Sequence, residues 1–243
     1  MTMVLAHRGS KGTHPENTLA AFKEAVRVKS EGIELDVQLS LDNHLVVIHD
    51  GEVDRTTNGQ GLVKEYTLKE LKEFDAGSWF HEDYNKETIP TFEEVIALLD
   101  ESDYKGLLNI EIKTDEYDYE GIEEMVLKVI TSKEYPFTIM LSSFNTETMK
   151  RLIALNNTFE KAIILDSSKR KIAFCEETTE ISGMHPSIEW IKGNIETVKG
   201  FNEGLRPWTI NSTEDMTLCF ELGITGFHTD FPEKAMQLKE SLS

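Results

Sequence analysis

The sequence lacks the features that mark disulfide-rich, zinc-binding and membrane-spanning proteins. Its two cysteines, Cys175 and Cys219, lie far apart and form no CxxC pattern, so we expect two buried thiols and neither a disulfide framework nor a zinc site. No apolar run approaches the roughly 18 residues that a spanning helix needs. The N-terminal MTMVLAHRGS has no basic region followed by an apolar one. We therefore expect a cytoplasmic protein without stable membrane association.

Positive charge is also scarce. The 25 lysines and arginines are outnumbered by 44 aspartates and glutamates, which gives a formal net charge of −19 at pH 7. A surface with this average charge repels phosphate backbones and anionic lipid headgroups, so nucleic-acid binding is not expected as the main activity. Any phosphate-bearing ligand must be held by a local group of cations.

Short β-rich apolar runs alternate with segments of helical period along the chain, which predicts βα units around a parallel sheet. The length suits a single barrel, so we expect one domain over residues 1–243. Nine candidate strands compete for eight places in a barrel: 3–6, 32–39, 45–49, 107–113, 137–142, 162–165, 181–185, 206–210 and 226–229. The expected helices span 16–28, 91–99, 120–131, 146–155, 195–201, 213–222 and 233–242.

The βα rhythm breaks between His49 and Thr91. Residues 51–90 are polar and contain several glycines, and the stretch is too long for an ordinary barrel loop. We expect a small inserted subdomain after the His49 strand. At the C-terminal face of the barrel it would lie over the site, where it could select substrates.

Two carboxylates share one face of the strand predicted at 32–39. Glu34 and Asp36 are two residues apart, so both point to the same side, while the apolar residues between them point to the other. Burying two carboxylates on one face is costly unless a cation lies between them. If Asp42 and Asn43 form a two-residue turn, the following strand places His49 directly opposite Asp36. A longer, bulged loop would shift that register by one residue.

The strand LLNIEIKT repeats this arrangement, with Asn109, Glu111 and Lys113 on one face. The alternative for each strand is a charged edge facing water, but both polar faces are backed by apolar residues that are expected to be buried. Three convergent carboxylates without cysteine or clustered histidine form a hard oxygen site. Mg²⁺ or Ca²⁺ suits such a site best.

A third element, Ala6-His7-Arg8-Gly9, follows the first predicted strand. An arginine can place two parallel hydrogen bonds on a phosphate, and a histidine can move protons near neutral pH. Taken alone, the pair His7-Arg8 is weak evidence, because such pairs are usually surface residues.

Together these segments resemble the glycerophosphodiester phosphodiesterase family. The motifs occur in the family's order and approximate spacing over nearly the whole chain: AHRG, PENTLAAF, IELDVQLS, LVVIHD, DRTTNGQG, LNIEIKT, SSF, WTIN and GITGFHTDFP. The resemblance implies a TIM (β/α)8 barrel and metal-dependent hydrolysis of small glycerophosphodiesters to glycerol 3-phosphate and an alcohol. It also implies two acid/base histidines, three metal-binding carboxylates and two phosphate-contacting cations: His7 and His49; Glu34, Asp36 and Glu111; Arg8 and Lys113.

Other residues depart from the family pattern or stay open. Lys29 and Ser30 replace a usual Gly-Ala, which puts the C-terminal cap of the preceding helix in doubt. His228 replaces a usually apolar residue and is expected to be a core or rim histidine, while His185 could line the site. Trp208 is a candidate wall of the pocket, although an aromatic on a barrel strand is more often core.

Two other functions compete with this hypothesis. One is a phospholipase relative on the same barrel that acts on intact lipids, which would need an apolar or basic rim. The other is a non-catalytic module that binds phosphate or Ca²⁺, which would have no need of two proton-moving histidines. The sequence leaves open the head group, the native metal, the assignment of acid and base, the attacking nucleophile and the oligomeric state.

Overall fold

The computed structural model describes residues 2–201 and 204–242. Its strands are β1 (Met3–Ala6), β2 (Gly32–Leu39), β3 (Leu45–Val47), β4 (Leu107–Ile112), β5 (Thr138–Ser143), β6 (Glu160–Ile164), β7 (Gly183–His185), β8 (Gly204–Leu205) and β9 (Gly226–Thr229). Its α-helices are α1 (Leu19–Arg27), α2 (Leu68–Leu71), α3 (Phe92–Glu101), α4 (Ile122–Ile130), α5 (Thr146–Ala154), α6 (Lys169–Glu177), α7 (Ile188–Gly193), α8 (Ile195–Lys199), α9 (Thr213–Leu222) and α10 (Pro232–Ser241).

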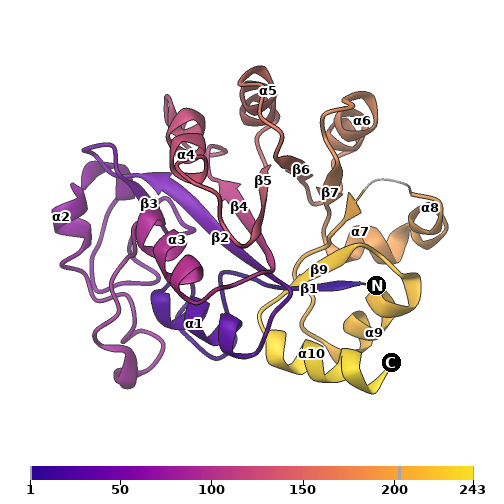
Figure 1. Cartoon of the computed structure of the whole chain (residues 1–243), viewed down its shortest axis with the longest axis horizontal. Coiled ribbons are helices and arrows are strands. Elements are labelled where there is room, and N and C mark those ends of the chain that lie inside the picture. The colour runs from indigo at the N-terminus through magenta and orange to yellow at the C-terminus, as the bar shows by residue number, and fades with distance from the viewer. Residues whose placement is uncertain (1, 202–203, 243) are drawn as a thin grey trace.

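The predicted barrel is confirmed. Eight strands run parallel in the order β8-β7-β6-β5-β4-β2-β1-β9, and the helices lie outside them (Figure 1). The ninth candidate strand, β3, takes no place in the barrel, because it pairs antiparallel with β2. Backbone bonds between 207–210 and β9 bring the two ends of the sheet together: Ile210 N–H donates to His228 O at 2.8 Å and His228 N–H donates to Pro207 O at 2.9 Å.

The strand predicted at 206–210 is wrong in its bounds. The structure has only the two-residue strand β8, Gly204–Leu205, before an irregular stretch. Pro207 has no N–H group and so cannot continue a regular ladder.

Most predicted helices are present, and three of them begin at a side chain that caps the first turn. Asn145, Ser212 and Thr91 accept hydrogen bonds from first-turn N–H groups of α5, α9 and α3, and Thr91 forms a capping box with Glu94. The end of α1 is also formed despite the absent glycine, since Lys29 takes the left-handed conformation at φ 57°. Helices α2, α6 and α7 were not predicted. Two are short, and the third, KRKIAFCEE, is mostly polar.

The barrel interior changes from apolar to polar along the strands. Near its N-terminal end, a small cluster consists of Leu5, Leu107, Met140 and Ala162. Two residues further along β4 stands Asn109, and two further still Glu111, on the same face. The opposite faces of β2 and β4 pack in the large core with the helices. Burial of that outer face positions the polar inner face.

The hairpin register predicted between β2 and β3 is wrong by one residue. Val37 pairs with Val47, so Ile48 rather than His49 lies opposite Asp36, and Ile48 N–H donates to Asp36 O at 3.2 Å. The reason is a three-residue loop closed by the Ser40 N–H bond to His44 O at 3.0 Å. Asn43 adopts φ 59° in that loop, as this loop type requires.

Residues 51–90 pack beside β3 and α3 (Figure 1). They contain α2 and two 3₁₀ turns, Val63–Glu65 and Glu82–Tyr84. Together with Val46 and Ile48, their apolar side chains form a hydrophobic cluster separate from the large core: Val53, Val63, Leu71, Ala76 and Ile89. In the described parts of the chain, no helix combines the length and the apolar character needed to cross a bilayer.

Candidate active site

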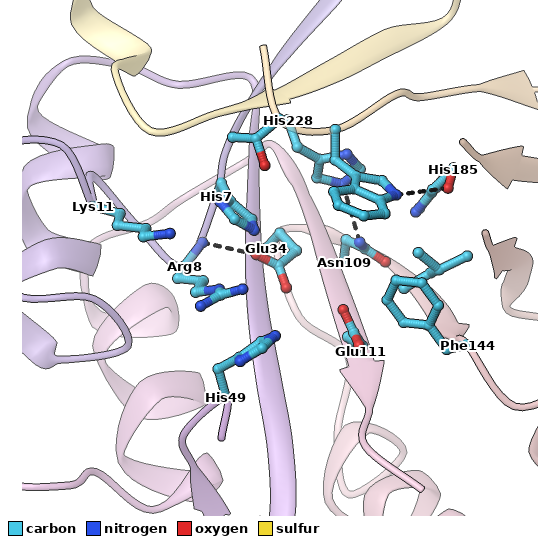
Figure 2. Close-up of a pocket in the computed structure, with 13 residues that line it drawn as sticks. His7, Arg8, Lys11, Glu34, His49, Asn109, Glu111, Phe144, His185 and His228 are labelled. Carbon is cyan, nitrogen blue, oxygen red and sulfur yellow. Dashed lines mark hydrogen bonds between the residues drawn. The ribbon is translucent and has the colours of Figure 1, made fainter. Parts of the chain in front are cut away.

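A cavity of about 330 Å³ opens at the C-terminal end of the barrel strands. It brings together residues from both ends of the chain: His7, Arg8, Lys11, Glu34, His49, Asn109, Glu111, Phe144, Ile164, His185, Trp208, Thr209 and His228 (Figure 2). Six of the eight site residues predicted from sequence line it. Of the other two, Asp36 lies beside Arg8 and Lys113 beside Glu111.

Three carboxylates converge at one side of this cavity. One oxygen each from Glu34, Asp36 and Glu111 lies within 4.8 Å of the others, and all three residues are buried. Asp36 and Glu111 are register partners in adjacent parallel strands, so their side chains emerge at the same level. Glu34 Oε1 and Asp36 Oδ1 are buried without a hydrogen-bond partner among the described residues. Buried anionic oxygens left free and aimed at one point suit a cation with hard oxygen ligands.

The electrostatics of the three groups show the same need. Burial and the charges of Asp36 and Glu111 hold the pKa of Glu34 well above its usual value. Burial also raises the pKa of Glu111, which Lys113 opposes and Asp36 reinforces. Burial would raise the pKa of Asp36 as well, but the nearby His49 and Arg8 lower it. Three charged carboxylates at this spacing require further positive charge.

Arg8 is fixed at the edge of the carboxylate group by its backbone and its side chain. Its backbone adopts the left-handed conformation at φ 53°, and its N–H donates to Glu34 Oε2 at 2.7 Å. The guanidinium donates from Nη1 to Glu16 Oε1 at 2.7 Å and lies 3.4 Å from Asp36 Oδ2 through Nε. Although burial acts to lower the pKa of Arg8, these carboxylates raise it, so the side chain is always cationic.

Lys113, directly after β4, supplies a second buried cation. Its Nζ donates to Glu111 Oε1 at 3.0 Å and lies 3.4 Å from His49 Nε2. Burial acts to lower the pKa of Lys113, but Glu111 and Asp36 raise it above its usual value. The lysine therefore keeps its charge beside the cavity.

His7 and His49 are both held through Nδ1 by a carboxylate. His7 Nδ1 lies 2.7 Å from Asp230 Oδ1, and His49 Nδ1 lies 2.6 Å from Asp50 Oδ1. An ionised carboxylate only accepts, so Nδ1–H donates in each pair and Nε2 carries the lone pair, which in His49 accepts from Lys113 Nζ. In Figure 2 the two rings lie on opposite sides of Glu34. Burial, then the charge of Arg8, lower the pKa of His7 to about 4, so its Nε2 carries a lone pair at neutral pH.

Sequence reasoning assigned no role to the residues that hold these side chains. Asp50 follows His49 directly in the motif LVVIHD, and Asp230 lies in the motif HTDFP. Both motifs contributed to the family resemblance, but their carboxylates were given no role. Glu16 links two arginines, since its carboxylate accepts from Arg8 and, at 2.7 and 2.9 Å, from Arg55. Arg55 also donates to Asp50 at 2.6 Å. Arg55 is thus a partner of two carboxylates.

Replacing Glu16 by glutamine should flatten the loss of stability in acid. Burial would raise the pKa of Glu16, but Arg55 and Arg8 lower it to about 2 from 4.5. The stability that Glu16 contributes is thus full above pH 4.5 and is lost as pH falls towards 2. The difference in unfolding free energy between wild type and Glu16→Gln, measured by urea titration, should shrink across this window by an amount on the order of 3 kcal/mol.

The matched control is Glu65→Gln, which removes an exposed carboxylate. Its difference from wild type should stay constant over the same pH range. A Glu16→Gln curve parallel to that of wild type would contradict the role given to the two arginines.

The opposite side of the cavity is aromatic and uncharged. Trp208, predicted as a wall, lines it; its indole N–H donates to His185 O at 2.9 Å and its ring meets Phe144 edge-on. His228, expected in the core or at the rim, is 3% exposed and also lines the cavity, as does His185. The site thus has a charged side and a mostly apolar side with two buried histidines.

Comparisons with known proteins agree with this geometry. The sequence matches the glycerophosphoryl diester phosphodiesterase family over residues 7–234. It is 40% identical to a glycerophosphodiester phosphodiesterase of Caldanaerobacter subterraneus, over 98% of this chain and 97% of that one, and 38% identical to one of Bacillus altitudinis over the full length of both. A phosphodiesterase of Oleispira antarctica, solved with the product sn-glycerol-3-phosphate, superposes with a TM-score of 0.87 at 29% identity, covering 99% and 97% of the two chains.

Proposed function

This chain belongs to the glycerophosphoryl diester phosphodiesterase family and is an enzyme of it, and from that premise we propose that it hydrolyses small glycerophosphodiesters by metal-dependent acid/base catalysis. The observation that carries the proposal is one cavity that is lined or bordered by three buried carboxylates, two carboxylate-anchored histidines and two largely buried cations. The product bound by the Oleispira antarctica relative supports a small, soluble substrate.

Glu34, Asp36 and Glu111 would hold the divalent cation, with Mg²⁺ and Ca²⁺ as the candidates. The unpartnered oxygens of Glu34 and Asp36 and the raised pKa values of Glu34 and Glu111 fit this role, because a bound cation would let all three carboxylates ionise together. When bound, the ion supplies positive charge that polarises the phosphoryl oxygens and offsets the charge that develops on them.

Arg8 and Lys113 supply the remaining charge. A phosphodiester monoanion repels nucleophiles, and the protein as a whole carries a formal charge of −19. Two fixed cations beside the cavity make a local site for phosphate within that acidic protein. Their carboxylate partners hold them in place before the substrate arrives.

His7 and His49 would move the protons. Hydrolysis needs a base for the attacking hydroxyl group and an acid for the poor alkoxide leaving group. Both rings present Nε2 from opposite sides of Glu34, and Asp230 and Asp50 fix their orientation through Nδ1. One histidine therefore acts as base while the other acts as acid, and binding alone would have no use for this pair.

Residues 51–90 would form an inserted subdomain that restricts the mouth of the site to small substrates. A hollow next to His49 and Lys113 is lined by Asp50, by residues 51, 52, 54 and 55 from this segment and by residues 115–117 after β4. Most of these side chains are charged, including the exposed Glu52 and Glu116. A lipid-binding rim would need apolar residues here.

The enzyme should release glycerol 3-phosphate from glycerophosphocholine and leave diacyl phosphatidylcholine in detergent micelles almost untouched. We expect kcat/KM for the diacyl lipid to be lower by at least roughly a hundredfold, because its acyl chains would contact a charged rim. Coupled detection of glycerol 3-phosphate, with phosphatidate measured in parallel, gives both rates.

The variant Glu52→Leu with Glu116→Leu should narrow this difference. Replacement of two exposed acidic residues outside the hollow, Glu93 and Glu124, by leucine controls for a general gain in hydrophobicity. Equal kcat/KM for the two substrates in the wild type would reject the restricting role and favour a phospholipase.

A further inference from the structure

His185 is a buried polar residue for which the mechanism above has no use. It ends β7, is 1% exposed and lines the cavity. Both of its ring nitrogens are buried and have no hydrogen-bond partner among the described residues. In Figure 2 its ring stands across the cavity from the charged side chains and turns a nitrogen towards the interior. A buried imidazole left in this state is destabilising, so it calls for an explanation.

The polar side chains of Ser142, Asn109 and His228 do not supply that partner, because they bond to one another and to a backbone carbonyl. Ser142 Oγ donates to Asn109 Oδ1 at 2.9 Å. Asn109 Nδ2 and His228 Nε2 are 3.2 Å apart, and His228 Nδ1 lies 3.2 Å from Arg206 O. A carbonyl oxygen only accepts, so Nδ1–H of His228 donates to it and Nε2 accepts from the amide.

This chain of bonds ends without reaching the nitrogens of His185. The ring of His228 contacts that of His185, with centroids 4.8 Å apart. The contact occupies one side of the His185 ring without satisfying either nitrogen.

The environment of His185 indicates which chemical group could be its missing hydrogen-bond partner. Burial, then the nearby His228 and Arg206, hold the pKa of His185 well below its usual value, so the ring is neutral. A neutral imidazole offers one donor and one acceptor, which is the pattern that a hydroxyl group complements. Phe144 and Trp208 on the same side of the cavity provide surface for the carbon atoms that carry such a hydroxyl.

We infer that His185 hydrogen-bonds a hydroxyl group of the substrate and is a specificity-determining residue of this site. The inference rests on the proposed hydrolysis of glycerophosphodiesters, because it places the phosphate at the charged side of the cavity and a hydroxyl-bearing carbon chain at the other. That hydroxyl belongs either to the glycerol half or to the alcohol half of the diester, and these two sources share the same chemistry.

The test compares three diesters as substrates, or as competitive inhibitors where turnover is slow. Glycerophosphocholine carries hydroxyls only on glycerol, propyl phosphocholine carries none, and glycerophosphoglycerol carries them in both halves. Replacing His185 by leucine should raise KM or Ki roughly five- to tenfold for hydroxyl-bearing compounds and leave propyl phosphocholine unchanged. His185→Gln, which keeps a donor and an acceptor, should recover part of the loss.

Two further readouts separate recognition from folding. His185→Leu removes two unsatisfied nitrogens, so its thermal midpoint should equal or exceed that of wild type, as at other sites where function is kept at the expense of stability. His14→Leu, at a half-buried histidine outside the cavity, is the matched control and should change no constant.

Loss on glycerophosphoglycerol alone supports the inference and assigns the hydroxyl to the alcohol half. Loss on glycerophosphocholine as well supports it and assigns the hydroxyl to glycerol. Equal effects on all three compounds, or none on any, overturn it. If the wild type hydrolyses no glycerophosphodiester, the proposed function itself is rejected. The His185 variants cannot produce that result, because it is measured on the wild type.

Discussion

Exhaustive chelation of divalent cations is expected to abolish hydrolysis of glycerophosphocholine, and Mg²⁺ or Ca²⁺ to restore it. The variants Glu34→Gln, Asp36→Asn and Glu111→Gln should each lower kcat at saturating metal by at least roughly a hundredfold, because each removes one anionic ligand while keeping its shape. Steady-state rates over a metal titration would show whether the loss lies in metal affinity or in turnover.

The effect of Glu34→Gln on stability should differ from its effect on activity. Burial and the charges of its neighbours raise the pKa of Glu34, so in chelator its carboxylate weakens the fold. Glu34→Gln should therefore leave the metal-free thermal midpoint unchanged or raise it while activity disappears. Such opposite effects are typical of a site kept for binding.

Glu123→Gln is the matched control. Glu123 is also a buried carboxylate, but it lies on α4 and accepts from Arg151 at 2.7 Å, away from the cavity. Its replacement should lower the thermal midpoint and leave kcat intact. Undiminished activity of the wild type after exhaustive chelation would reject the assignment of the three carboxylates.

Replacing His7 or His49 by alanine should lower kcat by roughly 10² to 10⁴ with the fold retained, as expected for the loss of a general acid or base. Circular dichroism and the thermal midpoint would confirm folding. Normal kcat in either variant would reject the role of that histidine.

An aryl phosphodiester then separates the two histidines. A phenolate leaves with little help from an acid, so the variant that lacks the acid should regain most of its rate on this substrate. The variant that lacks the base should not. Recovery of both variants, or of neither, would contradict a division of labour between the two rings.

The variants Asp230→Asn and Asp50→Asn should have kcat values between that of the wild type and those of the histidine variants. Each keeps the size of the side chain that holds Nδ1 but removes its charge, which permits the wrong tautomer of the histidine. We expect each to reproduce a large part of the loss seen on removing the histidine that it holds. For Asp230→Asn a pH–rate profile measures the change, because the Asp230 carboxylate raises the pKa of His7 and its loss removes that effect.

The faces of β2 and β4 could be predicted because alternation along a strand is local. Glu34 and Asp36 follow from a period of two residues, whatever the rest of the chain does. The register predicted for His49 was wrong because it depended on the length of the loop before β3. That loop has three residues instead of two, with Asn43 in the left-handed conformation. His49 nonetheless lies in the cavity, so its place depends on the chain beyond β3.

The carboxylates that hold the two histidines could not be predicted from local sequence patterns. His7 and Asp230 are 223 residues apart and meet only because β1 pairs with β9. No spacing rule connects them, and only the resemblance of whole motifs kept both in view. The missed helix α6 has a different cause, since its charged sequence carries little amphipathic signal and its place comes from packing on the barrel.

The bond between His7 and Asp230 also sets the order in which the site can mature. Glu34, Asp36 and Glu111 all lie in the first half of the chain, and β2 and β4 pair directly. Asp230 follows the last strand. A nascent chain that has emerged only through α9 therefore contains the acidic group but leaves the first histidine without its anchor. Nearly the whole polypeptide must therefore be synthesised before His7 has the anchor that its proposed role in proton transfer requires.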